Sequence, residues 1–168
     1  MRHRVGATER QKLVVKANIA VTYGRLGRDE EASRIERDVY LGHLKLSGRE
    51  DRDTFMAANN YAWGLFAIQR FEETKTLMRK TVPLARRVLG EGHEYTLNMR
   101  WVYGRALSAD TGATLKDHRE AVETFEATHR IARRVLGTAH PSTASIEGDL
   151  RIARAALRAR ETPSPGRA

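Results

Sequence analysis

The sequence contains no cysteine, which excludes disulfide bonds, cysteine-ligated zinc and thiol redox chemistry. Aromatic residues make up only 7% of the chain, so a core must be built largely from small and aliphatic side chains. No apolar run approaches the roughly 18–20 residues that a membrane-spanning helix needs. The N-terminal residues also lack the apolar block and small-residue cleavage site of a secretory signal. Together these absences predict a soluble, cytoplasmic protein.

Acidic residues are in the minority, with 21 Asp and Glu against 30 Lys and Arg, which gives a formal net charge of +9. A basic balance favours acidic partners such as nucleic acid, an anionic membrane or an acidic peptide. The basic residues are spread along the chain and mixed with acidic ones, as on the solvated surface of helices. Charge alone therefore does not select a partner.

One stretch of the sequence occurs twice. "RRVLGEGHEYT" (Arg86–Thr96) returns 47 residues later as "RRVLGTAHPST" (Arg133–Thr143). Earlier matches, such as Gly48 with Gly90 and Thr54 with Thr96, recur after 42 residues, and five extra residues within 108–117 account for the difference. The chain therefore contains repeats over about 10–51, 52–93 and 94–140, followed by a remnant over 141–160.

Each copy has the pattern of a helix pair. Apolar residues such as Phe55, Ala62 and Leu65 recur at helical spacing, and no segment alternates with the period of a strand. A single pair cannot bury both apolar faces, so the pairs must stack. The pattern predicts an all-α fold, an α-solenoid of antiparallel helix pairs. In copy two, Pro83 predicts a kink or a break in the second helix.

The expected organisation is a single array over residues 10–160, closed by a C-terminal capping helix over 141–160. Residues 1–9 are expected to be a frayed N-terminus. Residues 161–168, which read "ETPSPGRA", are proline-rich and polar, and we expect a disordered tail there.

The joint between copies has a mechanical explanation. Gly90 and Gly137 follow helices, where glycine supplies the left-handed cap. Asp51, His93 and His140 then fall at or near the N-caps of the following helices. The alternative, a metal site, is disfavoured because equivalent residues of successive repeats lie about a helix diameter apart, roughly 10 Å.

The motifs of this joint are similar to those of a known family. "LGEGHEYT" (Leu89–Thr96), "LGTAHPST" (Leu136–Thr143), "NNYAWGL" (Asn59–Leu65) and "QRFEET" (Gln69–Thr74) resemble the tetratricopeptide repeats of kinesin light chains. Those repeats are also longer than the ordinary ~34 residues. The resemblance implies a right-handed superhelix whose concave groove is lined by the first helix of each pair, and a non-catalytic protein-binding scaffold.

The candidate peptide-binding residues lie on the predicted first helices. Asn amides can bind both the N–H and the C=O of an extended peptide, Arg pairs with carboxylates, and Trp offers a flat contact surface. The candidates are Asn18, Asn59, Asn60, Trp63, Asn98, Trp101 and Arg105. The alternatives are core packing for the two tryptophans and a solvated helix face for the asparagines. The favoured function is a scaffold that binds an extended, acidic peptide.

A basic helical-repeat protein that binds nucleic acid is the alternative function. Repeat proteins that read RNA place matching side chains at one position of every repeat. The equivalent residues here, Asn18, Asn60 and Val102, do not form such a set. An enzyme is not expected, because the cluster of Asp117, His118 and Glu120 falls at a helix start, where acidic residues serve the helix dipole. No catalytic residue, cofactor or metal is predicted.

Overall fold

The computed structural model describes residues 2–162, and side chains from Thr8 onward. This part of the chain contains helices and no strand, which confirms the all-α prediction. The helices are α1 (Arg2–Arg25), α2 (Asp29–Ser47), α3 (Arg52–Ala67), α4 (Phe71–Leu89), α5 (Glu94–Ala109), α6 (Leu115–Leu136) and α7 (Pro141–Glu161).

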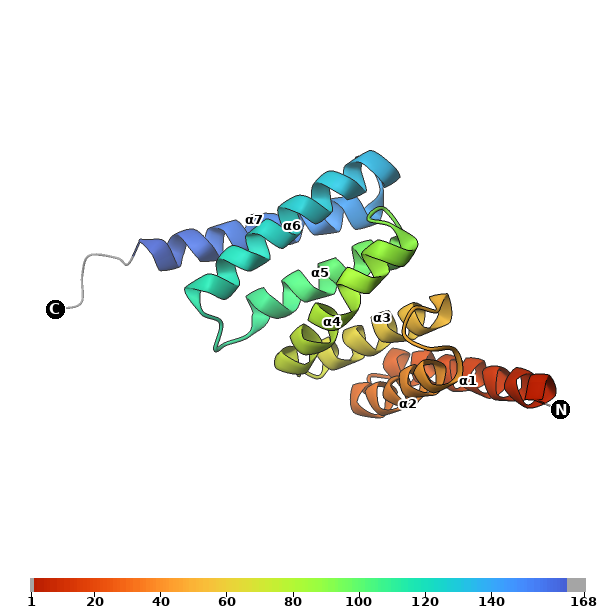
Figure 1. Cartoon of the computed structure of the whole chain (residues 1–168). Coiled ribbons are helices and arrows are strands. Elements are labelled where there is room, and N and C mark those ends of the chain that lie inside the picture. The colour runs from red at the N-terminus through yellow and green to blue at the C-terminus, as the bar shows by residue number, and fades with distance from the viewer. Residues whose placement is uncertain (1, 163–168) are drawn as a thin grey trace.

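Each helix packs against the next along the chain, and the pairs stack in sequence order with α1 and α7 at opposite ends (Figure 1). The first helices α3, α5 and α7 also touch one another in succession, whereas no such contact joins α1 and α3 among the described residues. One core cluster joins α3, α4 and α5 through Phe55, Met78 and Met99, and a second joins α5, α6 and α7 through residues such as Phe125 and Ile146. The array is therefore a solenoid whose core runs from pair to pair.

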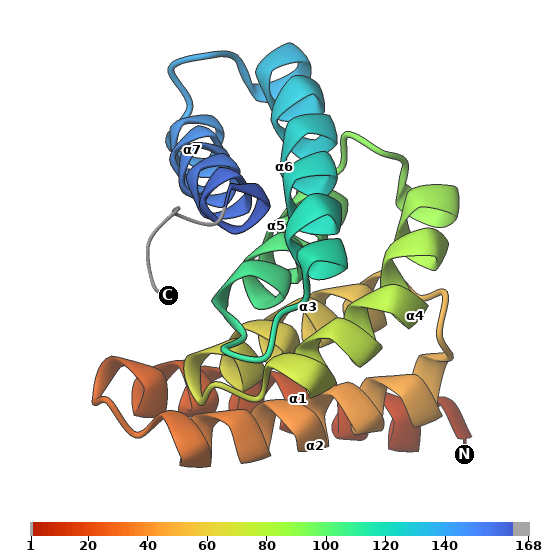
Figure 2. The same ribbon diagram turned by 90° about the vertical axis from the view of Figure 1, so that its left-hand side faces the viewer.

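The turned view in Figure 2 shows α1 and α2 as one layer and α6 and α7 at the far end of the stack. At the repeated joints, Gly90 and Gly137 end α4 and α6 with φ values of 95° and 88°. Residues with a Cβ atom are strained at such positive φ values, whereas glycine adopts them without strain. The glycines therefore end both helices at a positive φ as predicted, although their ψ values of 162° and 165° lie outside the left-handed helical region.

The residues predicted as N-caps also have that role. The carboxylate of Asp51 accepts a hydrogen bond from a backbone N–H of α3. Nδ1 of His93 accepts from the N–H of Tyr95, and Nδ1 of His140 accepts from the N–H of Ser142, each at 3.2 Å. Each histidine therefore satisfies a donor at a helix start, as the sequence predicted.

The five extra residues lengthen the connection between α5 and α6. Thr114 and Asp117 form a capping box that begins α6, so Asp117 serves the helix start as expected. The carbonyl of Ala113 accepts a hydrogen bond from Arg160 at 2.7 Å, which ties this loop to the end of α7. Within the described residues, no helix has the length and apolarity needed to cross a bilayer.

Two further expectations concern the course of individual helices. Helix α4 continues through Pro83 to Leu89, so of the two predicted outcomes, a kink or a break, the break is absent. Met78 and Ala85 are fully buried on either side of the exposed proline, and this packing holds both halves of the helix in place. At the N-terminus, α1 already begins at Arg2, within the segment predicted to fray. Of the expected tail, residues 163–168 lie outside the described residues.

Candidate peptide-binding groove

The first helices present one repeat position as a series. Val21 of α1, Trp63 of α3, Arg105 of α5 and Ile152 of α7 hold equivalent places in successive repeats. Val21 and Ile152 are 48% and 67% exposed, and Trp63 and Arg105 are partly exposed. We call this series the groove face, after the groove that the resemblance predicts along the first helices.

Two residues of the groove face, Trp63 and Arg105, lie close to a third predicted residue, Trp101. The rings of Trp63 and Trp101 make an edge-to-face contact with centroids 5.4 Å apart. The guanidinium carbon of Arg105 lies 5.5 Å from the centroid of the Trp63 ring and 4.6 Å from that of Phe66. We call Trp63, Phe66, Trp101 and Arg105 the aromatic–arginine cluster. Such contacts contribute about 0.5–1 kcal/mol each at exposed sites, and they orient the arginine.

Asp149 of α7 fixes the cluster from the neighbouring helix. Its Oδ2 accepts a hydrogen bond from Nε1 of Trp101 at 2.6 Å and lies 3.7 Å from Nε of Arg105. Sequence reasoning missed Asp149 and Phe66. For Asp149 a signal existed, because the repeat register places it where α1 and α3 have Asn18 and Asn60. Nothing comparable marks Phe66.

A cavity of about 290 Å³ adjoins the cluster and is lined by residues of α1, α2 and α3. Its walls are Ala17, Val21, Glu36, Val39, Ala57, Asn60 and Trp63. Burial raises the pKa of the Glu36 carboxyl to about 7, so this group is partly protonated at neutral pH. The cavity that Glu36 lines together with Asn60 is thus less negative than an ordinary glutamate would make it.

The remaining candidates lie at different depths. Asn59 is buried, and its Nδ2 donates to Oδ1 of Asn60 at 3.3 Å. Asn18 is exposed on α1, and Asn98 is half-buried on α5. No hydrogen bond or ring contact within the described residues joins Asn18 or Asn98 to the aromatic–arginine cluster. The structure therefore gathers Trp63, Trp101 and Arg105, with Asn60 in the adjoining cavity.

The alternative sites gain no support from the geometry. Among the described side chains, no group of three His, Asp or Glu residues could hold a metal ion. His118 is buried, and burial lowers its pKa, so it is a neutral core residue at neutral pH.

Comparison with known proteins places the chain in a class. A sequence model of the tetratricopeptide repeat family matches residues 13–53, 54–95 and 113–142, which is more than half of the chain. The chain belongs to the tetratricopeptide repeat family. Repeats of this family are scaffolds for protein–protein interaction, and the chain is such a scaffold. No match was found among curated proteins.

Solved structures similar to this chain are of the kinesin-light-chain type. Two are nearly identical tetratricopeptide-like repeats of a putative kinesin light chain from Podosopora anserina. One matches at 19% identity over 89% of this chain and 88% of its own length, with a TM-score of 0.54. The other matches at 17% over 91% and 98%, also with a TM-score of 0.54. BtubC (BKLC) from P. vanneervenii matches at 15% over 93% and 68%, with a TM-score of 0.55. The predicted resemblance is thus confirmed at the level of the fold.

Proposed function

We propose that the groove face binds an extended segment of a partner protein and prefers acidic segments. The observation that carries this proposal is the aromatic–arginine cluster, which combines flat aromatic surface with a cation at one place on successive first helices. Large aromatic side chains and arginine are the residues that contribute most to binding at protein interfaces.

The charge of Arg105 supports the acidic preference. Its side chain is 37% exposed, and its only ion-pair partner within the described residues is Asp149, at the long distance of 3.7 Å. Part of its hydrogen-bonding capacity therefore remains for a carboxylate of the ligand. Asn60 supplies an amide at the adjoining cavity that can pair with peptide backbone.

Nucleic acid is a poorer ligand for the same surface. The repeat position that begins with Asn18 and Asn60 continues with Val102, which is fully buried, and with the acidic Asp149. A phosphate-binding series would place basic or polar side chains there in each repeat. The groove face therefore favours a peptide.

A library experiment tests the proposal. The full chain is incubated with peptides enriched in Asp and Glu, and with a matched library in which Lys replaces the acidic residues. We expect selective capture from the acidic library, and loss of capture in the Asn60→Ala, Arg105→Ala double variant with unchanged circular dichroism.

Arg130→Ala is the matched control, because Arg130 is exposed on α6, away from the groove face. It removes the same charge as Arg105→Ala and should leave capture unchanged. Equal capture from both libraries would contradict the acidic preference. Full capture by the double variant would contradict the assignment of the site.

A further inference from the structure

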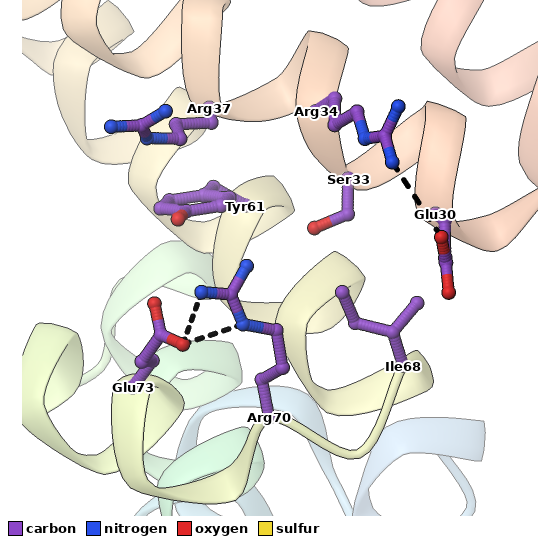
Figure 3. Close-up of a pocket in the computed structure, with 8 residues that line it drawn as sticks. All are labelled: Glu30, Ser33, Arg34, Arg37, Tyr61, Ile68, Arg70 and Glu73. Atoms are coloured by element: carbon purple, nitrogen blue, oxygen red, sulfur yellow. Dashed lines mark hydrogen bonds and ion pairs between the residues drawn. The ribbon is translucent and has the colours of Figure 1, made fainter.

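A second, larger cavity lies at the joint between the first two repeats, away from the groove face. It has a volume of about 750 Å³. Its walls come from α2, from the end of α3 and from the start of α4: Glu30, Ser33, Arg34, Arg37, Tyr61, Ile68, Arg70 and Glu73 (Figure 3). We call it the arginine cavity. None of these residues belongs to the aromatic–arginine cluster.

At the next joint, between the second and third repeats, charged side chains fill the position equivalent to the arginine cavity. Lys75 and Asp110 hold the repeat positions of Ser33 and Ile68. Nζ of Lys75 lies 2.9 Å from Oδ2 of Asp110 and 2.6 Å from a carboxylate oxygen of Glu72, and the Lys75 side chain is only 3% exposed. A buried ion pair therefore occupies the second joint. At the first joint the shorter serine and the uncharged isoleucine leave the space open.

A second set of contacts closes the second joint. Nε of Arg79 donates to the hydroxyl of Tyr103 at 3.0 Å, and that hydroxyl donates to Glu120. Arg79 also lies 4.0 Å from Glu120. All three polar groups thus have partners within the protein.

The equivalent residues at the first joint are Arg37, Tyr61 and Glu73, and they do not form this network. Glu73 pairs with Arg70 instead, which has no counterpart in the second network. Neither the guanidinium of Arg37 nor the hydroxyl of Tyr61 has a hydrogen bond or ion pair within the described residues. Figure 3 shows the Tyr61 ring between the side chains of Arg37 and Arg70.

We propose that the arginine cavity is a binding site for a phosphate monoester. Arg37 and Arg70 supply planar guanidinium groups on two sides of the Tyr61 hydroxyl, and Ser33 adds a second hydroxyl, which points into the cavity (Figure 3). A tetrahedral dianion has enough acceptor oxygens for all of these donors, whereas a carboxylate has two. Arg34 stands at the rim, 3.7 Å from Glu30.

The two carboxylates of the cavity do not cancel this charge. Glu30 and Glu73 each already face an arginine, so among the described residues Arg37 remains a cation without an ion-pair partner. Burial raises the pKa of the Tyr61 hydroxyl, which therefore stays protonated and can donate. The phosphate could be carried by a small molecule or by a phosphorylated side chain of a partner protein, and both would present the same chemistry.

The test titrates the full-length chain with inorganic phosphate, with a phosphoserine peptide and with the same peptide unphosphorylated. The readout is the NMR signal of the arginine Nε–H groups, together with calorimetry. We expect the Arg37 and Arg70 signals to shift in a saturable way with a phosphate-bearing probe, and the unphosphorylated peptide to leave them unchanged. Tighter binding of the phosphopeptide than of phosphate identifies a protein partner, and equal binding identifies a small phosphate ligand.

Two variants locate the site. Ser33→Lys with Ile68→Asp copies the residues of the second joint and should close the cavity. Arg37→Gln removes one unpaired, exposed cation and puts no packing at risk. Each should weaken binding at least about tenfold, whereas the matched control Arg79→Gln in the second joint should not. No saturable shift in the wild type, or equal binding by Arg37→Gln, would overturn the proposal.

Discussion

Glu36 is the most strongly perturbed carboxyl in the groove region. Its Oε2 atom is buried without a hydrogen-bond partner. A Cβ atom added at Gly64 would lie only 1.9 Å from this oxygen, so the carboxyl fills the space beside the glycine. Burial raises its pKa from 4.5 to about 7. The folded chain therefore holds a proton that the unfolded chain releases, so the free energy of unfolding must fall as pH rises between these two values.

Replacing this carboxyl tests the linkage. Glu36→Gln should stabilise the protein at pH 8 by about 1–3 kcal/mol, and this gain should vanish below the unfolded-state pKa. Urea unfolding at several pH values between about 4 and 8 measures this difference in the free energy of unfolding. That is roughly the range over which Glu36 titrates. Glu147→Gln, at an exposed position on α7, serves as the control. A pH-independent difference between Glu36→Gln and wild type would be inconsistent with a buried, protonated Glu36.

Two helical glycines make a matched pair for packing. A Cβ at Gly104 would lie 2.8 and 2.9 Å from ring atoms of Phe125, which is buried in the core. A Cβ at Gly148 meets nothing closer than Arg151 at 4.0 Å. Gly104→Ala should therefore destabilise the protein by about 1–3 kcal/mol through overpacking. Gly148→Ala should stabilise it by about 0.5–1 kcal/mol through helix propensity. Thermal unfolding compares them, and equal effects would contradict the close approach of α5 and α6.

At the scale of elements, the joints determine where each first helix begins. His93→Ala removes the acceptor for the Tyr95 N–H and should cost about 0.5–2 kcal/mol. His93→Asp should restore most of that loss, because Asp51 caps α3 from the same repeat position. Chemical denaturation of both variants measures the effect. Equal losses in the two would show that the imidazole does more than cap.

The elements were predictable from the sequence because their signals are local. Helical spacing, glycine ends and capping residues each act within a few positions, so the helix pairs and their joints followed from the repeat register. Helix α4 does not break at Pro83, because Met78 and Ala85 pack in the core on either side of the proline, and this packing could not be read from the local sequence.

Contacts between helices were not predictable in the same way. The hydrogen bond from Trp101 to Asp149 depends on how α5 and α7 lie together. The first joint is open and the second is closed, because Ser33 at the first stands where Lys75 stands at the second. This difference becomes visible only when the packing of α2 on α3 is compared with that of α4 on α5. The tryptophans and Arg105 could be assigned to first helices, but not to one cluster.

On the scale of the whole molecule, the net charge of +9 acts on binding at a distance. If the groove face binds an acidic segment, its affinity should fall as salt rises, since screening weakens the attraction between exposed charges. Calorimetry of a captured acidic peptide at low and high sodium chloride measures this. A peptide of the same apolar sequence with amides in place of carboxylates should show a much weaker salt dependence. An affinity that does not change with salt would argue against the acidic preference.

The most direct measurement uses the only two tryptophans of the chain, since Trp63 and Trp101 both lie in the aromatic–arginine cluster. Their indole N–H groups give two NMR signals that report on this one place. Titration with a captured acidic peptide should shift both signals in the wild type and neither in the Asn60→Ala, Arg105→Ala variant. A peptide that binds, shifts other signals and leaves both indoles unchanged would contradict the groove face as the binding surface.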